Sequence, residues 1–181
     1  MPKGTTMPDP QTTCPKPLFH DLRSRRVIFV AHCVLNQNAR LDGCAVFPNV
    51  MRDALEALTE ENVGIVQMPC PELMILGLDR CIAGHGEDMR IRDTLESKKA
   101  EALRAMAERL AVEIEEYRKN GFAVLGVLRI ENSPGCEPLN NALRAVLEER
   151  GIRDIPFIGL PENEWAEGAT RIRQVLSRRS G

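Results

Sequence analysis

Four short apolar runs, each followed by a stretch with helical periodicity, place the strongest constraint on how this chain can fold. The runs are rich in β-branched and other apolar residues, which is typical of buried β-strands. They span residues 26–32, 63–68, 122–130 and 155–160. Strands that alternate with helices predict a parallel sheet, because each connection between parallel strands has to cross back over a face of the sheet.

The segments between and after these runs predict amphipathic helices that cover the sheet. Apolar residues recur there at intervals of three and four, and Pro or Gly marks several of the ends. The helices are expected at residues 49–62, 94–121, 138–151 and 163–179, with Asn49 as the cap of the first. Because such crossovers are right-handed, we predict an α/β fold, a single three-layer Rossmann-like domain with a mostly parallel sheet of four to five strands.

The beginning of the chain differs from the rest. Residues 1–24 are rich in Pro, Thr and polar residues and show no apolar periodicity. We therefore predict a flexible N-terminal extension over residues 1–24 and one α/β domain over residues 25–181, which is a size typical of a single domain.

Composition argues against several classes of partner. The formal net charge is −2, and the chain has only one Trp, one Tyr and five Phe, which disfavours a nucleic-acid surface. No apolar stretch approaches the roughly 20 residues that a membrane helix needs, and the N-terminus lacks the apolar core of a signal peptide. We expect a cytoplasmic protein that binds a small molecule, neither nucleic acid nor membrane, with a homodimer left open.

Three of the six cysteines lie directly after predicted strands. Cys33 is at the end of the first strand, Cys70 follows the second and Cys136 follows the third. The carboxyl ends of parallel strands share one edge of the sheet, which is where ligands bind in such folds. In a cytoplasmic chain, cysteines are more often thiols or metal ligands than disulfides. We therefore expect these three thiols to converge on one metal or cluster site.

Two kinds of centre suit three thiolates. Zinc is one, with His32 or His85 as a fourth ligand, although the closely spaced Cys pairs of structural zinc sites are missing. An iron–sulfur cluster is the other, and a [4Fe-4S] cluster on three cysteines leaves one iron open as a Lewis acid. Cys44 and Cys81 lie near the same edge by sequence. Either could supply a fourth ligand, which would close the cluster, but we interpret them as spectators. Cys14 lies in the extension.

Three short motifs in this region resemble a known family. They are CVLNQNARLDG (33–43), CPE (70–72) followed by Arg80, and SPGC (133–136). In this order at strand ends they resemble the thiouracil desulfidase (TudS) family, and most closely its TudS-related desulfidase branch. The resemblance covers residues 26–137.

The resemblance implies a [4Fe-4S] cluster held by Cys33, Cys70 and Cys136. The iron without a protein ligand would take the sulfur of a thiocarbonyl or thioamide compound, such as a thiolated base, and release it as hydrosulfide without net redox change. The chain departs from the family at Leu41, where the family has an aromatic residue, and at Gly135, where it has Ser. The ligands are kept while the walls of the pocket differ.

Polar residues near the cysteines are the candidates for catalysis and substrate binding. Glu72 can act as general base or acid, and Ser133 can hydrogen-bond substrate or a transferred proton. Glu72 also reads as a helix or loop cap, and Ser133 as a turn former before a proline. The expected substrate-binding residues are Asn36, Arg40, Asp42 and Arg80.

Two other functions compete with desulfidation. One is a structural or redox-sensing module that holds a cluster or zinc without turnover. The other is a hydrolase whose nucleophile is Cys33 or Cys136, with His32 or His85 as the base.

Overall fold

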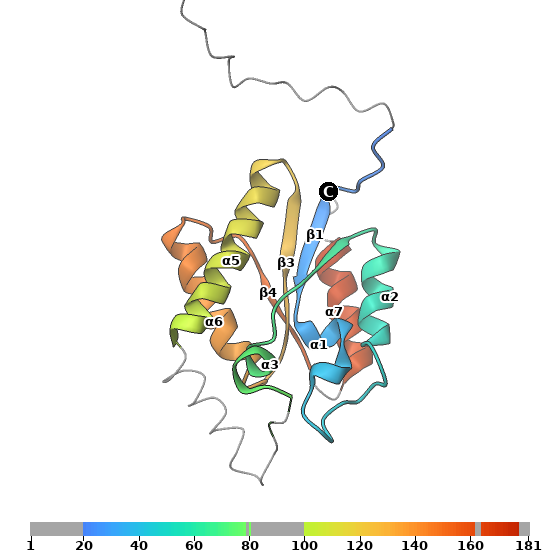
Figure 1. Cartoon of the computed structure of the whole chain (residues 1–181). Helices are drawn as coiled ribbons and strands as arrows, with labels where there is room; N and C mark the ends of the chain where they lie inside the picture. Colours follow the sequence, from blue (N-terminus) through green and yellow to red (C-terminus); the bar gives the residue numbers. More distant parts are fainter. Residues whose placement is uncertain (1–19, 79, 81–99, 162–163, 178–181) are drawn as a thin grey trace, which may run out of the picture.

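Four parallel strands run through the middle of the structure (Figure 1). The computed structural model describes residues 20–78, 80, 100–161 and 164–177. The strands are β1 (Arg26–Val30), β2 (Gly64–Gln67), β3 (Ala123–Ile130) and β4 (Phe157–Leu160), in the order β2-β1-β3-β4. The predicted α/β class and parallel sheet are confirmed.

Helices cover both faces of this sheet. They are α1 (His32–Leu35), the 3-10 turn η1 (Gln37–Ala39), α2 (Arg52–Glu60), α3 (Pro71–Leu76), α5 (Ala100–Lys119), α6 (Cys136–Glu149) and α7 (Trp165–Ser177). Helices α2 and α7 pack against each other on one face, and α5 and α6 pack together on the other (Figure 1). The result is the predicted three-layer arrangement.

The two central strands carry the core. Phe29 and Ile28 of β1 are fully buried, as are Leu125 and Leu128 of β3. Strand β2 was expected to be buried too, but its four residues are exposed or half-buried. The reason is its position, because β2 pairs with β1 alone and forms an edge of the sheet.

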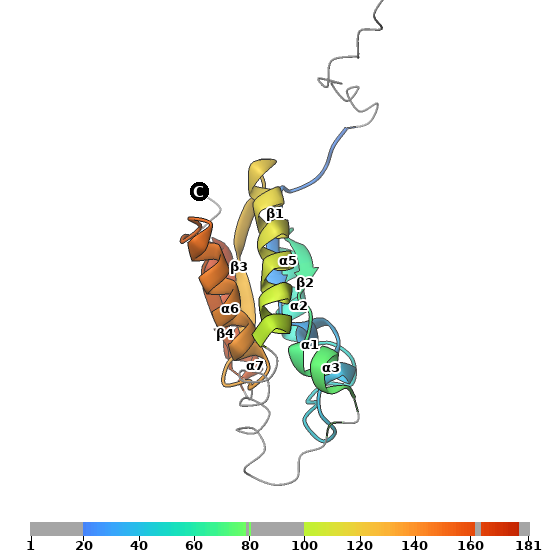
Figure 2. The same cartoon turned by 60° about the vertical axis from the view of Figure 1, so that its left-hand side comes forward.

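The strand order reverses between β1 and β3. The chain moves from β1 to β2 on one side and then returns past β1 to β3 and β4 on the other. In open parallel sheets, ligands bind outside the carboxyl ends of the strands at such a reversal. Helices α1 and α3 lie together at this end of the sheet (Figure 2).

Several predicted boundaries were wrong. The first strand ends at Val30, and His32 begins α1 instead of ending the strand. Helix α2 begins at Arg52, so Asn49 is too early in the chain to cap it, and Asn49 Oδ1 instead accepts a 2.8 Å hydrogen bond from Val50 N. Helix α6 begins at Cys136, two residues earlier than predicted.

Short helices escaped prediction altogether. α1, η1 and α3 span three to six residues each, which is too short for a helical repeat of apolar residues to show. Part of the long predicted helix, residues 94–99, and residues 1–19 of the predicted extension lie outside the described residues. Residues 20–25 are exposed and form no helix or strand. Within the described ranges, no helix is both long and apolar enough to cross a membrane.

Candidate functional site

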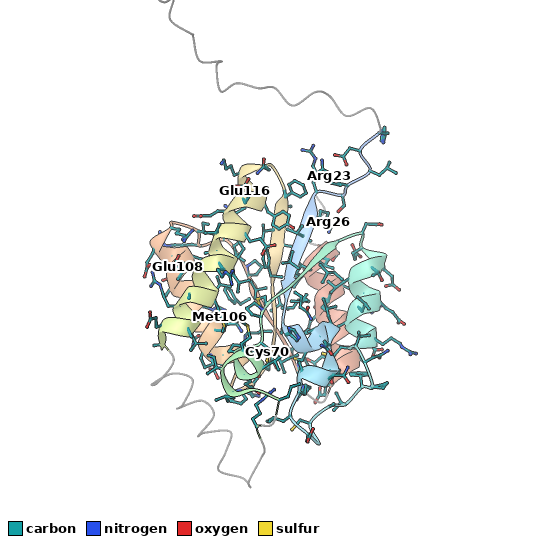
Figure 3. All side chains as sticks on the ribbon, viewed as in Figure 1. Arg23, Arg26, Cys70, Met106, Glu108 and Glu116 are labelled. Carbon is teal, nitrogen blue, oxygen red and sulfur yellow. The ribbon has the colours of Figure 1, made fainter. Side chains whose placement is uncertain are left out.

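Three cysteines from three separate connections line one cavity at the carboxyl end of the sheet. Cys33 lies in α1 after β1, Cys70 immediately precedes α3 after β2, and Cys136 is the first residue of α6 after β3. All three face a cavity of about 50 Å³. Figure 3 shows Cys70 below the ends of the strands. The expected convergence of these thiols is therefore present, and it lies where the strand order reverses.

We call this cavity the outer cavity. Apart from the three cysteines, its walls are partly polar. Its polar walls are three residues expected from sequence, namely Glu72, Ser133 and Arg40. Its apolar walls are Ala39, Leu41 and Ile130. Carboxylate, hydroxyl and guanidinium groups thus stand beside three soft sulfur donors.

A buried amide shapes the loop that carries Cys33. Gln37 is 1% exposed, and its Nε2 donates a 2.7 Å hydrogen bond to the Cys33 carbonyl oxygen. Its Oε1 accepts a 3.2 Å bond from the Val46 backbone N–H. The side chain therefore ties α1 to the loop that follows it. Sequence analysis missed Gln37, and its only signal is its place four residues after a cysteine inside the first motif.

Arg80 and Glu72 form a buried ion pair. Arg80 Nε lies 3.4 Å from Glu72 Oε2, and the two side chains are 5% and 12% exposed. Arg80 Nη2 also donates a 2.6 Å hydrogen bond to the Ala39 carbonyl oxygen, and Nη1 donates to the Gly77 carbonyl oxygen. Arg80 was expected to bind substrate, but it is not among the residues that line the outer cavity. It instead holds Glu72 and joins α3 to η1.

The other side of the Glu72 carboxyl group rests on Gly135. A Cβ atom at Gly135 would clash with the Glu72 side chain, within 2.7 Å of its Cδ. Gly135 precedes α6 and is buried. The departure from Ser to Gly in the third motif therefore makes room for the carboxylate.

Ser133 stabilises the start of α6. Its Oγ accepts a 3.2 Å hydrogen bond from the Cys136 backbone N–H, and its carbonyl oxygen accepts one of 3.1 Å from the Glu137 N–H. These bonds satisfy backbone donors that the first turn of a helix leaves without partners. The turn-forming interpretation of Ser133 is thus realised, while its side chain also lines the outer cavity.

Burial raises the pKa of all three thiols above the ordinary value of 9.0. Repulsion among the three sulfurs raises the pKa of Cys33 further. The nearby Arg40 lowers the pKa of Cys33 and Cys136, and a hydrogen bond from Ser133 also lowers that of Cys136, without cancelling the shift. Three thiolates in this site would repel one another, and a cationic centre bound between them would lower their pKa values.

The donor set suits an iron–sulfur cluster. It offers three buried sulfur ligands from separate loops, which is the ligation that such clusters take. Within the described chain, no group of three or more His, Cys, Asp or Glu side chains is arranged closely enough to hold a metal ion.

Other candidate residues lie away from the outer cavity. Asn36 caps η1, since its Oδ1 accepts a 3.1 Å hydrogen bond from Asn38 N. Asp42 is exposed in the turn before Gly43. Cys44 packs against the core without lining the cavity. The remaining candidates Cys14, Cys81 and His85 lie outside the described residues.

Comparison with known proteins gives a relative but no activity. No protein-family model matches the chain, and no solved structure matches it. An uncharacterized protein of Methanocaldococcus jannaschii is 29% identical over 150 residues, which cover 79% of this chain and 90% of that protein. The similarity therefore extends over most of the domain instead of one motif.

Proposed function

We propose that this protein is an iron–sulfur-dependent desulfidase that removes sulfur from a small thiocarbonyl or thioamide compound. The proposal follows the resemblance to the TudS family and places a [4Fe-4S] cluster on Cys33, Cys70 and Cys136. The overall reaction balances with water alone: the C=S group becomes C=O, and the sulfur leaves as hydrogen sulfide. It needs no oxidant or reductant.

The observation that carries this proposal is that the three cysteines line one buried cavity together with Glu72 and Ser133. When bound, the cluster supplies an iron without a protein ligand that can accept the sulfur of the substrate. The raised thiol pKa values fit this role, because such sulfurs are stable as thiolates only against a cationic centre.

Glu72 is the residue placed to move a proton. Its Oε2 is held near Arg80, and its Oε1 lies on the Gly135 side of the carboxyl group. A carboxylate fixed in this way can take a proton from the attacking water and return one to the substrate. Arg40 places positive charge at the wall of the cavity, where it stabilises an anionic centre or substrate.

A cysteine-nucleophile hydrolase is less well supported. A nucleophilic cysteine needs a lowered pKa, and burial raises the pKa of both Cys33 and Cys136. A redox-sensing module uses the same ligands, and turnover distinguishes it from the desulfidase.

The test begins with protein prepared anaerobically and reconstituted with iron and sulfide. We expect about four irons and four sulfides per chain, an absorption band near 400 nm typical of such clusters, and sulfide release from 2-thiouracil or from another member of a thioamide panel. Cys33→Ser, Cys70→Ser and Cys136→Ser should each lose the cluster and the activity. Cys44→Ser is the matched control and should keep both.

Two results would overturn the proposal. If wild-type protein takes up no iron, it holds no cluster and the proposed reaction has no centre. A loaded protein that releases no sulfide from any thiocarbonyl would leave the redox-sensing module as the better function.

A further inference from the structure

Two buried amides stand in the same relation to two of the cysteines. Gln37 follows Cys33 by four residues, and Asn140 follows Cys136 by four. In each pair the amide nitrogen donates a 2.7 Å hydrogen bond to the carbonyl oxygen of the cysteine. Gln37 and Asn140 are also the buried polar residues of the described chain.

The two amides differ at their oxygen atoms. Gln37 Oε1 accepts a hydrogen bond from the Val46 N–H. Asn140 is 3% exposed, yet its Oδ1 has no hydrogen-bond partner among the described residues. An unpaired buried acceptor destabilises a protein, so such atoms usually have a bound partner.

A second, smaller cavity is lined in part by Asn140. This inner cavity has a volume of about 20 Å³, and Asn140, His32 and the three cysteines are among its walls. A cavity needs roughly 10–15 Å³ and two or more polar partners to hold one water molecule. The inner cavity meets the volume condition, and Asn140 and the three cysteines, which carry polar atoms, are among the residues that line it.

We propose that Asn140 fixes one water molecule in the inner cavity, and that this water donates one hydrogen bond to Asn140 Oδ1 and the other to a cysteine sulfur. The water site depends on the amide and the thiols alone. Its effect on a bound metal or cluster rests on the proposed function.

A hydrogen bond to sulfur stabilises negative charge on a thiolate ligand. Outer partners of this kind change metal affinity by about 10–100-fold, and hydrogen bonds to sulfur help set the potential of a cluster. Asn140 is therefore a positioning residue, which acts on the centre through the water without touching it.

The test uses Asn140→Leu, with Gln37→Leu as the matched variant at the amide whose oxygen is already paired. The first readout is a high-resolution crystal structure of the full chain. The second is Co²⁺ affinity, followed by the charge-transfer absorption between sulfur and Co²⁺. The third is the midpoint of urea unfolding without metal.

For the wild type we expect one ordered water within hydrogen-bond distance of Asn140 Oδ1 and a cysteine sulfur. Asn140→Leu should lack this water and bind Co²⁺ about 10-fold more weakly, with an unfolding midpoint close to wild type. Gln37→Leu should lower the midpoint, because it leaves the Val46 N–H without its partner, and should keep the water.

An empty inner cavity, or a thiol that donates directly to Asn140 Oδ1, would overturn the inference. Unchanged Co²⁺ affinity in Asn140→Leu would overturn the role of the water. These outcomes are separate from the desulfidase proposal, because a protein that releases no sulfide can still show the water and the change in affinity. If wild-type protein binds no Co²⁺, the crystal structure alone decides the water site.

Discussion

The two ends of the sheet carry hollows of opposite character. At the amino end, Arg23, Arg25, Glu116, Tyr117 and other residues line a pocket of about 510 Å³. At the carboxyl end, the three cysteines share a cavity of about 50 Å³. Figure 3 shows Arg23 and Glu116 at one end of the molecule and Cys70 at the other.

The larger of the two hollows is not the one that gathers reactive side chains. Two of the charged residues at the amino-end pocket have partners: Arg23 forms a 2.7 Å ion pair with Asp21, and Glu116 Oε1 accepts a 2.7 Å hydrogen bond from Asn120 Nδ2. The carboxyl end concentrates three thiols whose pKa values are raised by burial. The position of the smaller cavity also agrees with where parallel sheets bind ligands.

The largest expected effect is a difference between two carboxylates at opposite ends of the sheet. Glu72→Gln should lower desulfidation by about 10²–10⁴-fold, because it removes the proton-transferring group while it keeps the shape of the side chain. Cluster content should stay near wild type. Glu116→Gln, at the amino-end pocket, should change neither. Rates of sulfide release and iron content measure both, and equal losses in the two variants would break the comparison.

The contact between Gly135 and Glu72 predicts the next effect. Gly135→Ala should destabilise the protein by about 1–3 kcal/mol, because its Cβ clashes with the Glu72 carboxyl group. Glu72→Ala removes that group and leaves Arg80 without its partner, so it destabilises the protein by itself. Adding Gly135→Ala to Glu72→Ala should then cost little more. Urea unfolding of the wild type, both single variants and the double variant gives the coupling energy. Additive losses would show that the two residues do not meet.

The raised pKa of the thiols predicts a loss of stability in alkali. The unfolded chain ionises its cysteines near pH 9.0, whereas the folded chain keeps Cys33, Cys70 and Cys136 protonated. Stability is therefore full below pH 9.0 and falls above it, by ~1.4 kcal/mol per pH unit for each thiol that ionises only on unfolding. Urea unfolding of metal-free protein between pH 8 and pH 10 measures this. The triple Cys→Ser variant is the control and should lose this part of the dependence.

The smallest effect is expected at the amino end of the sheet. The hydrogen-bonded ion pair with Arg23 lowers the pKa of Asp21 from 3.8 to about 2. The stabilisation that this pair gives the folded protein is therefore present above pH 3.8 and is lost as the pH falls toward 2. Both groups are on the surface, where such pairs contribute little. Asp21→Asn should therefore leave the unfolding midpoint at pH 7 and the metal content unchanged. A clear loss of either would mean that the exposed ion pair at the amino end contributes to stability or to metal binding.

Prediction from sequence succeeded where the signal is local and repeated. The periodicity of the chain indicated the four strands and the helices longer than eight residues, because burial on one face imposes its period on the sequence. It failed at α1, η1 and α3, which are shorter than the repeat that would reveal them. It also misjudged β2, because a single strand does not show whether it has one neighbour or two.

The candidate site divides in the same way. The sequence indicated that Cys33, Cys70 and Cys136 meet, since a parallel sheet brings the ends of its strands to one edge whatever the loops between them do. It did not indicate that Arg80 holds Glu72 or that Gly135 makes room for that carboxylate, because these contacts join loops distant in the chain.

By itself the sequence determined the order of the elements and the edge at which the thiols lie, since both follow from short-range periodicity and from the geometry of parallel strands. Tertiary structure alone decided which polar groups are paired. Asn140 and Gln37 have the same spacing from a cysteine, but only Gln37 finds a donor for its oxygen among the described residues. Such pairing depends on how separate loops pack in space, and neighbours in the sequence do not encode it.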